Sequence, residues 1–302
     1  MNCKNMILAL VVGAFGTVST ANAESGLLDV VPENAEQRIN FSGKLRMLSQ
    51  RIPSAACHLA QGVDRAGATD LLMASTAEFE QILTALELGD LDLNIQAPET
   101  NARTLDTIAT LRARWEPLKQ AAEAVAHDTA SAGDQAYVLN ENLPVLAAAQ
   151  LLVEQLVRQY SNPNAMTFSS LMLIDISGRQ RMLTQKMSKE SCMIQSGIET
   201  VALRDDLQGT MQVFENSLTA LCDGMDEVGI KPPPNDQIVA GLDEVVANWE
   251  GVKPYLTEVV AGGELYDEAD TLKFQGLNMT MVNMNTVVGM YADSAKRLVP
   301  LL

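Results

Sequence analysis

The chain has 302 residues, with 38 Asp or Glu against 21 Lys or Arg, so its formal net charge at pH 7 is −17. So negative a charge argues against nucleic acid and anionic membrane surfaces as partners. Aromatic residues make up only 4% of the chain, and runs of alternating β-branched residues are lacking, which argues against a β-sheet protein.

The first 23 residues have the layout of a secretory signal peptide. A short basic start precedes an apolar run over 6–18, and Ala21-Asn22-Ala23 matches the small-residue cleavage pattern. The run is shorter than the roughly 20 residues that a membrane-spanning helix needs. We expect cleavage after Ala23. Nothing downstream looks long and apolar enough to span a membrane, so we expect a soluble mature protein in a bacterial periplasm.

The rest of the chain divides into eight amphipathic segments, separated by Gly- and Pro-containing breaks such as Lys231-Pro232-Pro233-Pro234. The predicted helices run over 33–62, 68–88, 98–127, 133–160, 166–200, 203–228, 235–261 and 264–299. Four amphipathic helices joined by short loops are typical of an antiparallel four-helix bundle. The sequence therefore predicts an all-α protein of two tandem antiparallel four-helix bundles, over 24–162 and 163–302.

A repeated motif supports this division. The sequence INFSGKLRMLSQR begins at Ile39, and IDISGRQRMLTQK begins at Ile174, 135 positions later. The same shift pairs Phe79-Glu80 with Phe214-Glu215, and a shift of 134 pairs the two tryptophans. The duplication therefore covers nearly the whole predicted mature chain, as in repeat proteins.

On a helix, the first motif forms two seams on opposite faces. The apolar seam, which we expect inside its own bundle, contains Phe41, Leu45, Leu48, Ile52, Ala55 and Leu59. The second seam contains Ile39, Gly43, Arg46, Gln50, Pro53 and Cys57 in the first copy, and Ile174, Gly178, Arg181, Gln185, Ser188 and Cys192 in the second. Its small, mostly uncharged residues suit a helix that pairs with another bundle, and the glycines would allow close approach.

An arginine in such a seam would be partly desolvated and would need an anion. The planar guanidinium matches a flat oxyanion such as nitrate or a carboxylate. We hypothesise that the two bundles pair through their first helices, so that Arg46 and Arg181 share one site. Gln50 and Gln185, one turn further on, are additional candidates for ligand binding. The alternative, left open by spacing alone, is an ordinary solvated face of each helix.

Three cysteines follow the predicted cleavage point, and an exported protein can form disulfides. If a helical hairpin turns near 205–207, Cys192 and Cys222 lie at similar heights on its two arms. We therefore predict a Cys192–Cys222 disulfide, with Cys57 free.

The remaining candidates for chemistry are weaker. His58 and His127 lie in no metal-ligand spacing, and we interpret both as ordinary surface or helix residues. Met279, Met281 and Met284 suit copper(I), but methionine more often fills helical cores, which is the interpretation we favour. No catalytic motif is present, so we predict neither enzymatic activity nor a cofactor.

The segment SGRQRMLTQK, and less closely SGKLRMLSQR, resembles the signature of the PilJ-type domain of type IV pili methyl-accepting chemotaxis transducers. The segment is also similar to the nitrate-recognition segment of NarX-type sensor kinases. The resemblance implies a four-helix sensor bundle that dimerises through its first helix. It also implies a small anion held between two first helices by Arg46 and Arg181, beside Gly43 and Gly178.

The chain departs from the family pattern in two ways. No kinase or methyl-accepting coiled coil is found before Leu302, so we expect a membrane-bound signalling partner. Pro53 falls inside the first motif helix and is expected to kink it. The pairing of first helices within one chain or across a homodimer stays open.

The sequence therefore predicts a periplasmic binding or sensory protein for a nitrate-like anion or a carboxylate. The alternative is a structural or adaptor bundle whose first-helix seam binds another helical protein.

Overall fold

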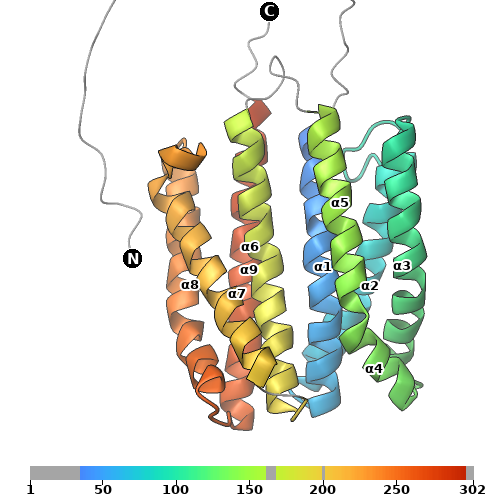
Figure 1. Ribbon diagram of the computed structural model, residues 1–302, viewed down its shortest axis with the longest axis vertical. Helices are drawn as coiled ribbons and strands as arrows, with labels where there is room; N and C mark the ends of the chain where they lie inside the picture. The colour runs from blue at the N-terminus through green and yellow to red at the C-terminus, as the bar shows by residue number, and fades with distance from the viewer. Residues whose placement is uncertain (1–34, 161–167, 199–200, 297–302) are drawn as a thin grey trace, which may run out of the picture.

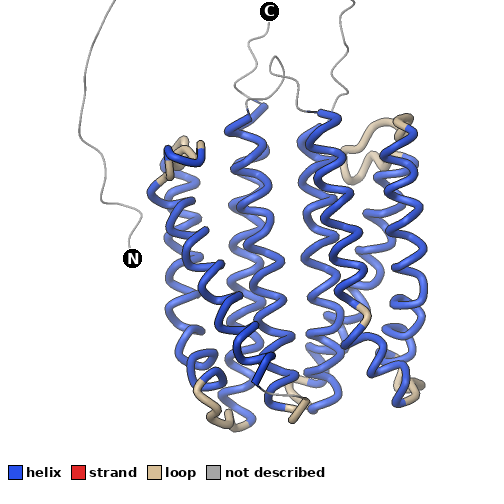
Figure 2. The backbone as a smooth tube through the Cα atoms, viewed as in Figure 1, coloured by secondary structure: helices blue, strands red, loops and turns tan. Residues whose placement is uncertain are grey.

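The computed structural model describes residues 35–160, 168–198 and 201–296. The predicted signal peptide lies outside the described residues. Within them the chain is helical, and extended pairing is limited to two isolated bridges, Asp90 with Ile95 and Met225 with Ile230. Figure 2 shows long helices joined by loops at the two ends of the molecule. The predicted all-α class is confirmed.

The first set of helices comprises α1 (Ala35–Gln61), α2 (Arg65–Leu88), α3 (Ala102–Ala126), α4 (Ala132–Asn140) and α5 (Asn142–Tyr160). The second set comprises α6 (Phe168–Gln195), α7 (Val201–Asp223), α8 (Asp236–Val260) and α9 (Asp267–Lys296). The two sets stand side by side, with α1 and α6 in the middle (Figure 1). Each predicted helical segment is found, with ends that differ by a few residues.

The fourth helix of the first set is broken at Glu141, which the sequence analysis did not anticipate. Pro144 has no N–H, and its ring crowds the carbonyl four residues earlier. The Asn142 side chain also donates hydrogen bonds to the carbonyls of Val138 and Leu139 at 3.3 and 2.6 Å. These competing contacts end α4 and let α5 start in a new direction.

The apolar seam of α1 faces its own helices, as predicted. Leu45, Leu48 and Ile52 are fully buried, and α1 packs on α2 and α5. The second seam is buried too, because α1 and α6 make the most extensive contact between any two described helices. A helix with two buried faces belongs to the centre of the molecule, and α1 and α6 together form that centre.

Residues 132–160 form the one described stretch that is long and apolar enough to cross a membrane by length and composition alone. The expectation that no such stretch follows the signal peptide is therefore wrong on those two criteria. In this fold the stretch is divided at Glu141, and α5 packs on α1 and α3. Its buried residues include Val145, Ala149, Leu152 and Leu156.

Candidate anion site between α1 and α6

The helices α1 and α6 pack along their second seams, where the two equivalent cysteines meet. Ser54 donates a hydrogen bond to Ser188 at 2.7 Å, and Cys57 forms a disulfide with Cys192 at a sequence separation of 135. The seam is therefore a contact within one chain. This arrangement brings the two copies of the motif together without a second molecule.

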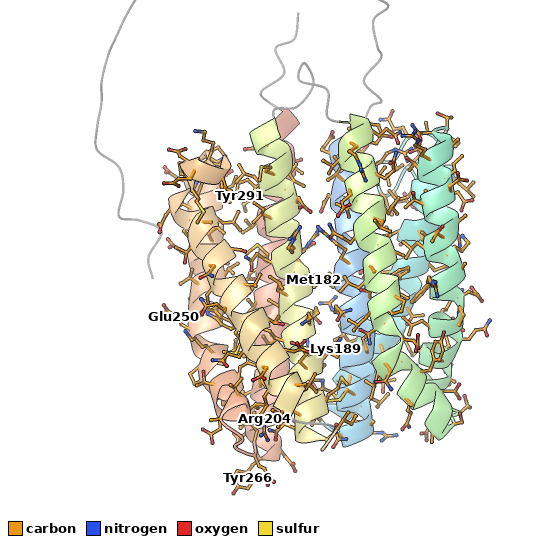
Figure 3. The ribbon with its side chains drawn as sticks, in the orientation of Figure 1. Met182, Lys189, Arg204, Glu250, Tyr266 and Tyr291 are labelled. Atoms are coloured by element: carbon orange, nitrogen blue, oxygen red, sulfur yellow. A yellow bond between two sulfur atoms is a disulfide. The ribbon has the colours of Figure 1, made fainter. Side chains whose placement is uncertain are left out.

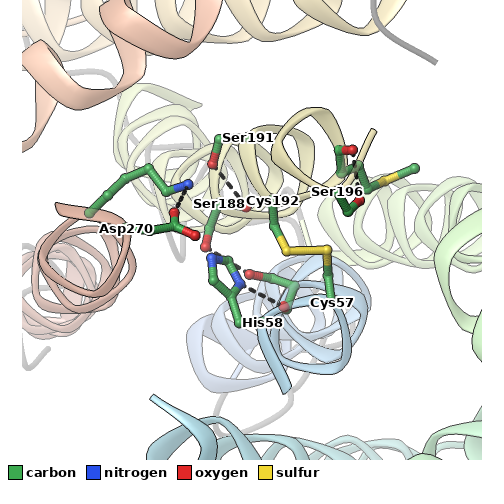
Figure 4. The surroundings of a disulfide bond; sticks show 10 residues. Cys57, His58, Ser188, Ser191, Cys192, Ser196 and Asp270 are labelled. Atoms are coloured by element: carbon green, nitrogen blue, oxygen red, sulfur yellow. Dashed lines mark hydrogen bonds and ion pairs between the residues drawn. A yellow bond between two sulfur atoms is a disulfide. The ribbon is translucent and has the colours of Figure 1, made fainter. Parts of the chain in front are cut away.

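The disulfide corrects a prediction. Cys192 is bonded to Cys57, so the predicted Cys192–Cys222 pair is wrong, and Cys57 is not free. The prediction compared heights along one hairpin. It overlooked that the two equivalent cysteines can meet where the second seams pack. The Cα atoms of Cys57 and Cys192 are 6.2 Å apart, within the usual range for a disulfide. Figure 4 shows the bond joining the two central helices.

Arg46 and Arg181 lie next to each other in the middle of this seam, and each is only 1% exposed. A methyl group placed on Gly43 would be 3.4 Å from the Nη2 atoms of both arginines, and one placed on Gly178 would be 3.4 and 3.6 Å from them. The glycines therefore make room for the two guanidinium groups, rather than for a closely approaching backbone. The predicted convergence of the two arginines on one place is found.

The outer contacts of the two arginines are nearly symmetric. Arg46 Nη1 donates to Gln150 Oε1 at 2.7 Å, and Arg181 Nη1 donates to Asn285 Oδ1 at 2.7 Å. Arg46 Nη2 lies 3.5 Å from the carbonyl of Asp175, and Arg181 Nη2 donates to the carbonyl of Asn40 at 3.1 Å. The side chains that hold the guanidinium groups thus come from α5 and α9, one on each side of the seam.

The surroundings of the two arginines differ at one side chain, and this side chain sets the charge that each arginine faces. Asp175 Oδ1 lies 2.7 Å from Arg46 Nη2, whereas the equivalent position facing Arg181 is Asn40, which carries no charge. Burial lowers the pKa of Arg46, and Asp175 partly offsets that shift. Burial and the neighbouring Arg46 lower the pKa of Arg181 to about 9, which leaves it a cation at neutral pH. Arg46 therefore has a carboxylate in contact, whereas Glu78, which pairs with Lys44, favours the charged form of Arg181 only through space.

The two glutamines behave differently. Gln50 donates to Asn142 Oδ1 at 3.2 Å and to the Ser49 carbonyl at 3.2 Å. That carbonyl lacks its usual helical partner because Pro53 has no N–H. The helix α1 continues through Pro53 without a break, and the expected kink stays a prediction. Gln185 is buried, and neither atom of its amide has a partner among the described residues.

The model of the type IV pili methyl-accepting chemotaxis transducer N-terminal domain, PilJ, matches residues 32–140 and 172–270, more than half of the chain. The chain belongs to the PilJ family. A search of curated proteins finds no match. The predicted similarity to NarX-type sensors is not shown by these comparisons and stays a prediction.

The two matched segments of this PilJ-family protein each begin close to a motif helix, α1 or α6. The family match therefore falls on both copies, as the internal repeat predicts. It places the protein with the sensory-type N-terminal domains of chemotaxis transducers. The exact division into 24–162 and 163–302 stays a prediction, because residues 161–167 lie outside the described part of the chain.

Lys189 is a buried cation that the sequence analysis missed. It replaces Ser54 in the second copy and donates to Gln50 Oε1 at 2.8 Å and Asn142 Oδ1 at 2.9 Å. Burial lowers its pKa to about 8. Figure 3 shows Lys189 and Met182 on α6 at the boundary between the two sets of helices. A lysine next to the second seam was the available signal, because the equivalent residue of the first copy, Ser54, is small and neutral.

His58 lies beside the disulfide (Figure 4) on helix α1 and is fully buried, so it is a helix residue, as one of the two interpretations had it, and not a surface residue. Its Nδ1 lies 2.8 Å from the Ser54 carbonyl, and its ring stacks on Phe274 of α9 at 4.1 Å. Burial, with a smaller effect from buried Lys273, lowers the pKa of His58 to about 4. Asp270 forms an ion pair with Lys273. His127, in contrast, is exposed.

The three clustered methionines of α9 differ in burial. Met281 and Met284 are buried in the core, while Met279 is 51% exposed on the other face of α9. The core interpretation is therefore confirmed for Met281 and Met284. Among the described residues, no group of three His, Cys, Asp or Glu side chains is arranged to hold a metal ion.

Proposed function

We propose that this protein binds a small planar oxyanion, nitrate or nitrite in the first instance, between Arg46 and Arg181. The PilJ family supports a sensory role, in which the bound anion reports to a membrane-bound signalling partner from the periplasm. The bound anion has no catalytic part in this proposal.

One observation carries the proposal: of two adjacent arginines, each 1% exposed, Arg46 has a carboxylate in contact, whereas Arg181 has Asn40 in that place. An uncompensated buried cation is expensive. A protein whose net charge is −17 has no shortage of carboxylates, yet position 40 carries an asparagine. An added anion would supply the missing charge, and the guanidinium donors suit a flat oxyanion.

The alternative was an adaptor that binds another helical protein through the first-helix seam. That seam is occupied by the pairing of α1 with α6 and closed by a disulfide, so it offers no free face to a partner helix. The structure therefore gives this alternative no support.

The test is thermal unfolding of the purified protein in a panel of sodium salts at constant ionic strength. An anion at about 100 times its Kd adds about 2.7 kcal/mol to the free energy of unfolding, which raises Tm by several degrees for a chain of this size. We expect a rise in nitrate or nitrite that is lost in Arg181→Ala. Equal Tm values in nitrate and chloride would refute the proposal.

A further inference from the structure

The two halves differ in how the arginine site is covered. On one side α9 packs against α1, where Arg51 reaches Met281 Sδ at 3.7 Å and His58 stacks on Phe274. On the equivalent side, α5 makes no comparably extensive contact with α6 along the described residues. The α5–α6 side is therefore more open than the α1–α9 side, to which the repeat relates it.

A groove of about 320 Å³ lies between α5 and α6 on this side. Its size is at the lower end of the roughly 300–1,000 Å³ that is typical of small-molecule sites. Its apolar lining consists of Val153, Val157, Met172 and Ile176. Its polar lining consists of Gln150, Glu154, Arg158 and Asp175.

Two of the lining residues connect the groove to the arginine pair. Gln150 accepts a hydrogen bond from Arg46 Nη1, and Asp175 forms the ion pair with Arg46 Nη2. Arg46 thus contacts two of the four polar residues that line the groove. A ligand in the groove would reach this guanidinium by displacing one carboxylate.

Asp175 has a second partner to which it can turn. Its Oδ2 lies 3.4 Å from Nη2 of Arg179, one turn along α6, and the Arg179 side chain is 45% exposed. When a ligand carboxylate binds Arg46, Asp175 still has Arg179 as its partner. It stays at the water-exposed rim, where 24% of its side chain is exposed. The exchange therefore leaves no buried carboxylate unpaired, which would be the main cost of displacement.

We infer that the α5–α6 groove binds a small organic acid with a compact apolar body. Its carboxylate takes the place of Asp175 on Arg46, and its apolar body lies on Val157, Met172 and Ile176. This inference rests on the proposed anion function, because it uses the same arginine, and it adds a ligand class. Inorganic anions and acetate gain nothing from the apolar walls, whereas a larger acid buries apolar surface there.

The test is isothermal titration calorimetry of the purified protein with benzoate, acetate, nitrate and benzyl alcohol. Benzoate offers a planar carboxylate and an apolar ring, while benzyl alcohol offers the ring without the charge. We expect benzoate to bind roughly tenfold or more tightly than acetate, since ring burial contributes about 25 cal/mol per Å². Benzyl alcohol should bind more weakly than benzoate by a similar factor.

Two variants locate the binding. Met172→Gln makes one wall of the groove polar and should reduce the preference for benzoate over acetate to roughly threefold or less. Leu151→Gln is the matched control, because Leu151 is 53% exposed on α5 and does not line the groove. It should keep the full preference. Arg46→Ala should abolish benzoate binding, with the helical circular dichroism retained.

The outcomes separate this inference from the function on which it rests. Benzoate binding no tighter than acetate, together with nitrate binding that is lost in Arg181→Ala, would overturn the groove and leave the anion site standing. Benzoate binding that survives Arg46→Ala would overturn the carboxylate position. Failure of all three anions to bind would overturn both proposals.

Discussion

The outer helices of the two copies repeat the same side-chain contacts, whereas the charged residues around the central α1–α6 seam differ between the copies. At the periphery, Trp115 Nε1 donates to Glu80 at 3.0 Å, and Trp249 Nε1 donates to Glu215 at 3.0 Å. A lysine pairs with each of these carboxylates. The isolated bridge Asp90–Ile95 also has its copy in Met225–Ile230. The two bundles thus use the same contacts to hold their outer helices.

In the seam, the backbone arrangement is repeated but the charges are not. Asp175 stands opposite Arg46 where Asn40 stands opposite Arg181. Lys189 replaces Ser54, and His58 replaces Met193. The packing of α1 on α6 does not by itself require the two copies to differ in charge. The difference teaches that the two arginines are unequally compensated, because Arg46 has a carboxylate in contact and Arg181 has Asn40 in that place, and an added anion would reduce this imbalance.

The largest effect is expected from the covalent link across the seam. Replacing Cys57 and Cys192 together by serine removes a cross-link that closes a loop of 135 residues. Chain entropy then predicts a loss of roughly 4 to 5 kcal/mol in the free energy of unfolding. Urea unfolding measures this loss. Ser54→Ala is the matched seam control and should cost about 1 kcal/mol; equal losses in the two variants would show that the cross-link contributes little.

The next effect is a pH dependence confined to one copy. The His58 side chain binds a proton near pH 6.5 in the unfolded chain but only near pH 4 in the folded one. As pH falls from about 6.5 to 4, the unfolded state gains the proton first. Stability therefore falls, by roughly 3 kcal/mol in total. Above pH 6.5 both states are neutral, and His58 contributes no pH dependence.

Replacing His58 by methionine, the residue that occupies this position in the second copy, should remove that part of the acid loss. The measurement is urea unfolding at pH 7, 5.5 and 4, taken as the difference between variant and parent. His127→Met should leave the difference near zero, because His127 is exposed. Identical pH profiles for His58→Met and the parent protein would contradict the burial of the neutral imidazole.

The smallest effects have opposite signs in the two copies. Arg181→Met removes a buried cation that has no carboxylate in contact and should raise the free energy of unfolding by about 1 kcal/mol in anion-free buffer. Arg46→Met removes the cation that Asp175 faces and should lower it by about 1 kcal/mol. Chemical unfolding of both variants in low salt measures the two changes. Equal losses in both would show that Arg181 is as well compensated as Arg46.

Much of this arrangement follows from periodicity and repetition. Apolar residues spaced by three and four define α1 and α6, and the opposite stripe of the same helices predicts a second packed face. Because the motif occurs twice, the two second seams are predicted to pack against each other. The meeting of Arg46 and Arg181 was predictable for that reason.

The rest depends on contacts that the local sequence does not contain. The break before α5 needs Asn142 to turn its amide back on two carbonyls, a competition that a helical pattern does not reveal. The burial of His58 depends on Phe274, which is more than 200 positions away in the sequence. The disulfide was within reach, since Cys57 and Cys192 are copies on one seam, but the sequence analysis applied the geometry of a hairpin instead.

The most direct test exchanges the one charge that distinguishes the two arginines. Calorimetric titration with nitrate should show roughly tenfold tighter binding in Asp175→Asn, because the internal competitor is gone, and at least tenfold weaker binding in Asn40→Asp, because Arg181 gains a carboxylate. The double exchange should return the affinity close to that of the parent protein. Nitrate affinities within twofold of each other in all four proteins, or no nitrate binding in any of them, would contradict an anion site between α1 and α6.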